Sequence, residues 1–128
     1  MGKSLIDIAK EVIQTESDSV LLLKDRIDQN FIDVCHTLKS CMGKVVLIGM
    51  GKSGHIAKKI SSTFASTGTP AFYLHPGEAG HGDLGMVSHD DVVIMISYSG
   101  ESDEIIALLP GIKRMNVPII SMTGNANS

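Results

Sequence analysis

The sequence predicts a three-layer α/β/α protein built on a doubly wound parallel sheet. Four short runs of apolar and β-branched residues lack a polar side, which is typical of strands buried on both faces. Segments with apolar residues at helical spacing separate these runs. Strand–helix–strand alternation favours parallel strands joined by right-handed crossovers, with helices on both faces of the sheet. The length of 128 residues suits one domain, residues 1–128.

The N-terminal part, residues 1–42, is predicted to be helical. Apolar residues at positions 5, 8, 9, 12 and 13 share one helical face, and this stripe requires a partner surface. Ser17–Asp18 is a candidate N-cap for a second helical stretch. That stretch runs almost to Cys41, either as one long helix or as two helices broken near Gln29–Asn30.

The α/β core, residues 43–128, carries the strands. Pro110 is expected to interrupt the last helix, because it removes a ladder donor. The closing residues, 123–128, leave a strand and should begin another helix, so we expect the domain to continue past Ser128. The predicted strands are residues 44–48, 71–74, 91–96 and 117–122, and the predicted helices are residues 53–67 and 102–115.

Composition and charge exclude several classes of partner. The net charge is −3 and Lys and Arg form no block, which argues against nucleic acids and anionic membranes as partners. The N-terminus does not resemble a signal peptide, and no apolar run reaches membrane-span length. Cys35 and Cys41 lack metal-ligand spacing, so we expect buried, reduced thiols and a cytoplasmic protein. A small or neutral partner is therefore favoured.

Residues 49–54, GMGKSG, follow the first predicted strand and allow three interpretations. The pattern GxGxxG fits a dinucleotide site, but such a site needs an acidic residue at the end of the second strand, which here reads Tyr73-Leu74-His75. A nucleotide P-loop needs a glycine where Val46 stands. The third interpretation makes this glycine loop one half of a site for a single phosphate.

The other half of that site is residues 97–102, SYSGES, which we call the serine turn. It follows a buried strand and opens a helix, where hydroxyls and free backbone N–H groups converge on an anion. The plain structural alternative is that Ser99 caps the helix and Ser97 ends the strand. Three serines within six residues, opposite Ser53 of the glycine loop, favour a phosphate monoester.

Two stretches carry a family resemblance: GMGKSGHIAKKISSTFASTGTPAFYLHPGEAGHGDLGMV and DVVIMISYSGESDEI. They resemble the sugar isomerase (SIS) domain, and most closely its arabinose 5-phosphate isomerase branch, which serves Kdo and lipopolysaccharide synthesis. The resemblance implies a flavodoxin-like sheet, a homotetramer, and isomerisation between D-ribulose 5-phosphate and D-arabinose 5-phosphate. It also implies further catalytic residues and CBS domains beyond Ser128. Phosphate-binding positions fall on Ser53, Ser97, Ser99 and Ser102, and catalytic positions fall on Lys52 and Glu104.

Aldose–ketose isomerisation moves a proton through an enediol, so the site needs a base, an electrophile and a fixed phosphate. Glu101 and Glu104 are three residues apart on the predicted first helical turn, where they would share a face near the phosphate. The alternative is that both only balance the helix dipole. Lys52, between Gly51 and Ser53, would polarise an oxygen or hold the phosphate, and we place Gly51 in the phosphate-binding loop.

The loop at residues 75–83 is the second candidate segment. His75, Glu78 and His81 would bind a divalent metal on a helix, but Pro76 and three glycines argue against a helix there. Imidazole donates and accepts protons near neutral pH. We therefore assign His81 to catalysis and His75 to sugar binding, and we expect neither a metal nor another cofactor.

Two other functions remain open. The same domain occurs in non-catalytic phosphosugar sensors, where the serine turn is needed but a base is not. The glycine loop alone keeps an NAD-dependent oxidoreductase as a third possibility. Lys52 and Glu104 favour the enzyme, and the N-terminal helices show no basic face for DNA.

Overall fold

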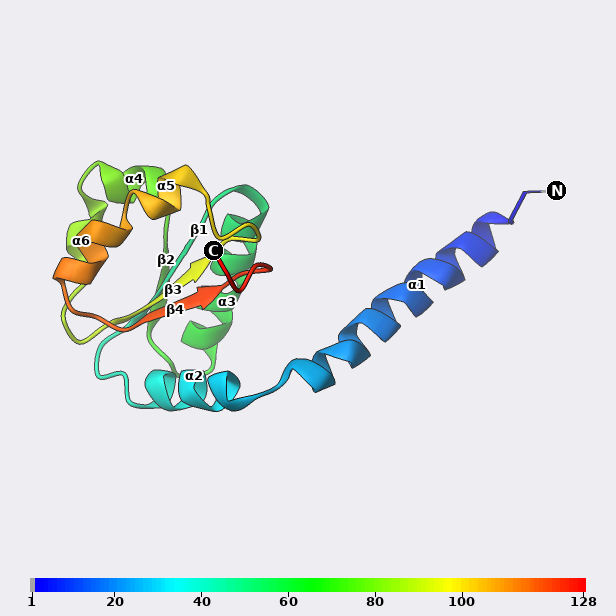
Figure 1. The fold of residues 1–128 in the computed structure, drawn as a ribbon, viewed down its shortest axis with the longest axis horizontal. Helices are drawn as coiled ribbons and strands as arrows, with labels where there is room; N and C mark the ends of the chain where they lie inside the picture. The colour runs from blue at the N-terminus through cyan, green and yellow to red at the C-terminus, as the bar shows by residue number, and fades with distance from the viewer. Residues whose placement is uncertain (1) are drawn as a thin grey trace. The chain divides into compact units, whose positions relative to one another are not determined.

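The computed structural model describes residues 2–128, which fall into two compact units, residues 2–35 and residues 36–128 (Figure 1). The first unit holds helix α1 (Leu5–Leu21), the 3₁₀ helix η1 (Leu22–Arg26) and most of α2 (Gln29–Lys39), whose last turn belongs to the second unit. The helical N-terminal part is therefore confirmed. The assignment of residues 1–128 to one domain stays a prediction.

The predicted N-cap at Ser17–Asp18 is wrong, because α1 continues through both residues to Leu21. The Asp18 carboxylate accepts a hydrogen bond from the Gln14 amide at 2.8 Å, one turn earlier in the same helix. These polar side chains therefore bond within the helix instead of opening a new one. The break lies just before α2, where Asp28 Oδ1 accepts the Asn30 N–H at 3.0 Å, so the expected break near Gln29–Asn30 is confirmed.

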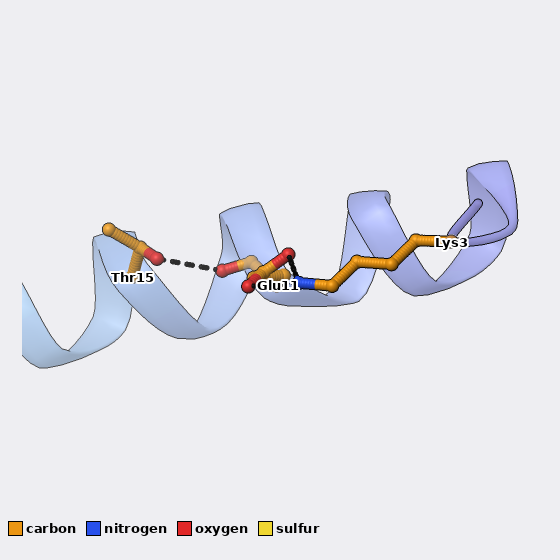
Figure 2. A network of polar contacts seen from close by, with 3 residues as sticks. All are labelled: Lys3, Glu11 and Thr15. Carbon is orange, nitrogen blue, oxygen red and sulfur yellow. Dashed lines mark hydrogen bonds and ion pairs between the residues drawn. The ribbon is translucent and has the colours of Figure 1, made fainter. Parts of the chain in front are cut away.

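The N-terminal unit has a solvated surface. Figure 2 shows the Lys3 ammonium against the Glu11 carboxylate, 2.7 Å from each oxygen, with the Thr15 hydroxyl donating to the Glu11 carbonyl at 2.9 Å. In the described part of α1, η1 and α2 no residue is buried, but Leu38 near the end of α2 is half-buried and packs against the core of the second unit. Cys35 is exposed and Cys41 is half-buried; both are free, but the prediction that both are buried is wrong.

The second unit is built on a four-stranded parallel sheet with the order β2-β1-β3-β4. All four predicted strands are confirmed to within two residues at either end. The order matches the flavodoxin-like arrangement, in which the first strand lies inside the sheet. The strands are β1 (Val45–Gly49), β2 (Ala71–Leu74), β3 (Val92–Ile96) and β4 (Ile119–Met122).

Helices cover both faces of this sheet, which confirms the three-layer prediction (Figure 1). Helix α3 (Gly51–Ser66) starts two residues before the predicted helix. The predicted helix at 102–115 is divided into α5 (Asp103–Ile106) and α6 (Leu109–Arg114), with Pro110 in the first turn of α6. Between β2 and β3 lie α4 (Pro76–Gly80) and the 3₁₀ helix η2 (Asp83–Met86).

The core alternates across β1, as strands buried on both faces require. Val46 and Ile48 pack on the side of α5 and α6, whereas Val45 and Leu47 pack on the side of α3. All four side chains are fully buried. The sheet is therefore a rigid platform that fixes the ends of its strands. In residues 2–128 no helix combines the length and apolarity needed to cross a membrane.

Candidate functional site

The glycine loop and the serine turn meet at one edge of the sheet. β1 and β3 are neighbours, and Gly49 at the end of β1 stands opposite Ile96 at the end of β3. The chain leaves β1 into α3 on one face and leaves β3 toward α5 on the other, which makes this pair of strand ends a topological switch point. Ligands of open α/β sheets bind in the crevice at such points.

The glycine loop, Gly49–Gly54, packs closely on itself and leaves the first N–H groups of α3 without a side-chain cap. Gly51 begins α3 with a φ of +56°, and a Cβ on Gly54 would lie 2.7 Å from the Gly49 carbonyl oxygen. Met50 gives the helix no side-chain cap, so the first N–H groups of α3 point toward the edge of the sheet. Lys52 is exposed and Ser53 is half-buried in this first turn, which suits an anion.

A tyrosine that the sequence did not single out supports this loop. The Tyr73 hydroxyl, from β2, donates to the Gly49 carbonyl at 2.8 Å, and the Lys58 ammonium lies 5.1 Å from the ring centre. Burial raises the pKa of Tyr73, and the Glu78 carboxylate raises it further, so the phenol remains a donor at neutral pH. This contact joins residues 24 positions apart, and no local sequence pattern predicts it.

The serine turn, Ser97–Ser102, is closed by its own hydroxyls. Ser97 Oγ lies 2.8 Å from Ser102 Oγ and accepts the Gly100 N–H at 3.1 Å, while Ser99 Oγ accepts the Glu101 N–H at 3.1 Å. Two backbone N–H groups expected to be free are therefore bonded, and the Gly100 N–H also lies 3.2 Å from the Ser97 carbonyl oxygen. An anion would have to compete with these acceptors. The alternative that Ser99 caps the helix is wrong, because α5 begins at Asp103.

The two glutamates lie differently from the prediction. Glu104 is exposed in the first turn of α5, but Glu101 precedes the helix, so the expected shared helical face is wrong. His81 is exposed at the C-terminal end of α4, and α4 contacts α5. Glu104 and His81 are thus carried by neighbouring elements on one side of the sheet.

His75, which was predicted to bind the sugar, also has a structural role as the N-cap of α4. Its Nδ1 accepts the Gly77 N–H at 3.0 Å and so caps α4, a helix that the glycines here were wrongly expected to prevent. Nδ1 is therefore the unprotonated nitrogen, and the other ring nitrogen is left to donate. Within residues 2–128, no three His, Cys, Asp or Glu side chains lie close enough to hold a metal ion.

A hollow of about 750 Å³ opens beside the serine turn but does not coincide with the predicted site. Of the predicted residues, only Ser97 and Glu101 line it, with Gly100 between them. Its other walls combine apolar side chains, from Met95, Ile105, Ile106, Leu109 and Ile119, with polar ones, from Asp103, Lys113, Ser121 and Ser128. Because the glycine loop contributes nothing to this hollow, the switch point where the glycine loop and the serine turn meet is the better candidate for a phosphate site.

Comparison with known proteins agrees with this geometry. The family described as SIS domain matches residues 38–128, which include all four strands, the glycine loop and the serine turn. The chain belongs to the SIS-domain family. Among curated relatives of this SIS domain, the arabinose 5-phosphate isomerase KdsD of Escherichia coli K12 is 57% identical over 93% of the chain. The Pseudomonas aeruginosa protein of the same name is 52% identical over 96%.

The SIS domain also matches solved structures. A structure from Escherichia coli CFT073 in complex with arabinose 5-phosphate superposes with a TM-score of 0.84 and 46% identity, over 98% of this chain and 69% of the other. The chain spans only 36% of the length of the Escherichia coli K12 relative and 38% of the Pseudomonas aeruginosa one. The match therefore covers the glycine loop and the serine turn and leaves most of each curated relative outside it.

Proposed function

We propose that this chain is the SIS domain of an arabinose 5-phosphate isomerase, which interconverts D-arabinose 5-phosphate and D-ribulose 5-phosphate. The observation that carries the proposal is the meeting of the glycine loop and the serine turn at the switch point between β1 and β3. The names of the relatives, and the sugar phosphate in the complexed structure, support this substrate.

In the proposed site the substrate phosphate lies between the two loops. Ser53 and the Gly51 backbone approach it from one side, and the serine turn, through Ser97, Ser99 and Ser102, approaches it from the other. The start of α3 adds the positive end of a helix dipole. The negative phosphate would thereby be fixed while the sugar chain extends across the edge of the sheet.

The chemistry is a proton transfer between adjacent carbons. A base removes the proton from C2 of the aldose, the enediol forms, and a proton is delivered to C1 while the C2 oxygen becomes the carbonyl. We assign the carbon proton to Glu104 and the transfer between the oxygens to His81. The Lys52 ammonium would stabilise the developing oxyanion, and Glu101 and His75 would hold sugar hydroxyls.

The direct test uses the full-length protein with each sugar phosphate. We expect D-arabinose 5-phosphate to be converted to D-ribulose 5-phosphate, and to raise the thermal midpoint of unfolding because it binds the folded state. NAD at the same concentration should not raise it. A midpoint raised by NAD alone would favour the oxidoreductase. Binding of the sugar phosphate without turnover would favour the sensor.

The assembly and the pathway belong to the same proposal. We assign this enzyme to the cytoplasm, in the supply of Kdo for lipopolysaccharide, as a homotetramer. The exposed apolar side chains of the N-terminal unit, among them Leu5 at 85% exposed, support self-association. Native mass spectrometry of the full-length protein should show a tetramer, and a monomer at micromolar concentration would contradict the assembly.

A further inference from the structure

The loop that leaves β4 is tied to the serine turn, although no role has yet been given to it. The Gly124 N–H donates to the Tyr98 carbonyl at 2.9 Å, and the Thr123 hydroxyl lies 3.3 Å from the same oxygen. The Ser97 N–H donates to the Met122 carbonyl at 3.1 Å. Residues 122–124, which we call the exit loop, thus bond two backbone groups of the serine turn, the Ser97 N–H and the Tyr98 carbonyl.

The fit between the two segments leaves no room for a larger residue. A Cβ on Gly124 would lie 2.8 Å from Cε2 of Tyr98 and 3.1 Å from the Tyr98 carbonyl oxygen. A Cβ on Gly100, whose φ is +73°, would collide with the Ser128 side chain and would also lie 2.9 Å from Thr123 Oγ1. The tyrosine ring is 86% exposed and can swing away, but its carbonyl belongs to the backbone of the turn and cannot move alone.

Thr123 also fixes the shape of the exit loop itself. Its Oγ1 accepts the Asn125 N–H at 3.1 Å, a side-chain-to-backbone turn that orients the following peptide. The Gly124 N–H is thereby aimed at the Tyr98 carbonyl. Because Tyr98 stands between Ser97 and Ser99, a shift of its peptide moves both hydroxyls that border the proposed phosphate.

We propose that Thr123 and Gly124 are positioning residues, which hold the serine turn in the shape that binds the substrate phosphate. The inference rests on the proposed function, because it takes the serine turn as a phosphate site. Neither residue needs to touch the ligand: the exit loop acts through the Tyr98 carbonyl. Three of the four strand ends, those of β1, β3 and β4, then contribute to anion binding.

The test compares four variants of the full-length protein: Thr123→Val, Gly124→Ala, Thr123→Ser and the control Thr67→Val. Thr67 donates to the Thr63 carbonyl at the other end of α3, so its change removes a similar hydroxyl away from the site. For each we measure KM and kcat for D-arabinose 5-phosphate and the inhibition constant of inorganic phosphate. Urea unfolding reports the stability of every variant.

Thr123→Val and Gly124→Ala are expected to raise KM and the phosphate inhibition constant by a common factor of about three to ten, the range of one or two lost hydrogen bonds. The fold decrease in kcat should be smaller than the fold increase in KM. Thr123→Ser keeps the hydroxyl and should restore most of the affinity, and Thr67→Val should leave both constants unchanged.

Several outcomes would overturn the inference. One is a loss of stability in Thr123→Val with KM and the phosphate constant unchanged, since the exit loop would then be only structural. Another is an equal effect of Thr123→Ser and Thr123→Val. If Gly124→Ala does not fold, the two threonine variants carry the comparison. A wild-type protein that converts no sugar phosphate refutes the proposed function instead, and phosphate binding measured by thermal shift still tests the exit loop.

Discussion

Glu104→Gln is expected to lower kcat for D-arabinose 5-phosphate by about 10²- to 10⁴-fold, the range that a positioned proton-transfer group contributes. The glutamine keeps the size of the side chain and removes only its ability to take and return a proton. KM should change by less than tenfold, because the phosphate is assigned to the serine turn. Steady-state kinetics of the full-length enzyme in both directions measure the effect.

Asp103→Asn is the matched control for Glu104→Gln. Asp103 lies in the same first turn of α5 and is also exposed, so its change removes one negative charge from the same helix end. If Glu104 acted only by balancing the helix dipole, both variants would show the same small fall in kcat. A kcat for Glu104→Gln equal to that of Asp103→Asn would therefore remove Glu104 from the proton-transfer step.

The fold of the second unit was predictable because its signals are local. The run at 71–74 is bounded by Pro70 and His75, and it forms β2 with the predicted ends. Pro110 divides the predicted helix because a proline lacks the donor that an uninterrupted helix needs.

In the N-terminal unit, Ser17–Asp18 led to a wrong prediction of an N-cap, since these residue types also occur inside helices when their side chains bond to neighbouring turns.

The site was predictable only as far as strand order brings loops together. Gly49 and Ile96 are 47 residues apart, but parallel neighbours place their ends at one edge, so pairing the glycine loop with the serine turn needed no knowledge of side chains. The contacts that hold these loops were not predictable. Tyr73 reaches Gly49 from the next strand, and the exit loop reaches Tyr98 across a crossover; each depends on the register and on the path of a loop.

The two loops also differ in what prepares them for an anion. The glycine loop leaves helix N–H groups without a side-chain cap, whereas the serine turn uses its hydroxyls to bond its own N–H groups. In the proposed site, a phosphate at the glycine loop would meet helix N–H groups that no side chain caps, whereas at the serine turn it would compete with hydrogen bonds within the turn. We therefore expect the affinity for phosphate to depend on the shape of the serine turn, and so on the contacts that the exit loop makes with it.

Asp91 is another residue whose importance the sequence did not reveal. It is 1% exposed at the entrance to β3. One carboxylate oxygen accepts the Lys44 N–H at 2.7 Å and the other accepts the Ser88 N–H at 2.8 Å, so the side chain joins the start of β1 to the loop before β3. Burial alone would raise the pKa of Asp91, but the hydrogen bonds from Ser88 and Lys44 outweigh it and hold the pKa below its usual value.

Asp91→Asn is expected to lower the free energy of unfolding by about 2 kcal/mol at pH 7, measured by urea unfolding. The asparagine amide has one oxygen, so one of the two backbone donors would face an NH₂ group instead of an acceptor. Asp90→Asn is the control. Asp90 is exposed, and its carboxylate lies 3.4 Å from the ring of exposed His89, so the loss should be below about 0.5 kcal/mol.

The effect of Asp91→Asn should also depend on pH with a defined sign. A carboxyl whose pKa is lowered by folding stabilises the folded state above the unfolded value of about 3.9, and this stabilisation is lost as the pH falls through the lower folded value. The stability difference between wild type and Asp91→Asn should therefore be constant from pH 7 to pH 5 and shrink below about pH 4. A difference that remains constant down to pH 2 would show that the shape of the side chain, and not its charge, holds β1 to the loop before β3.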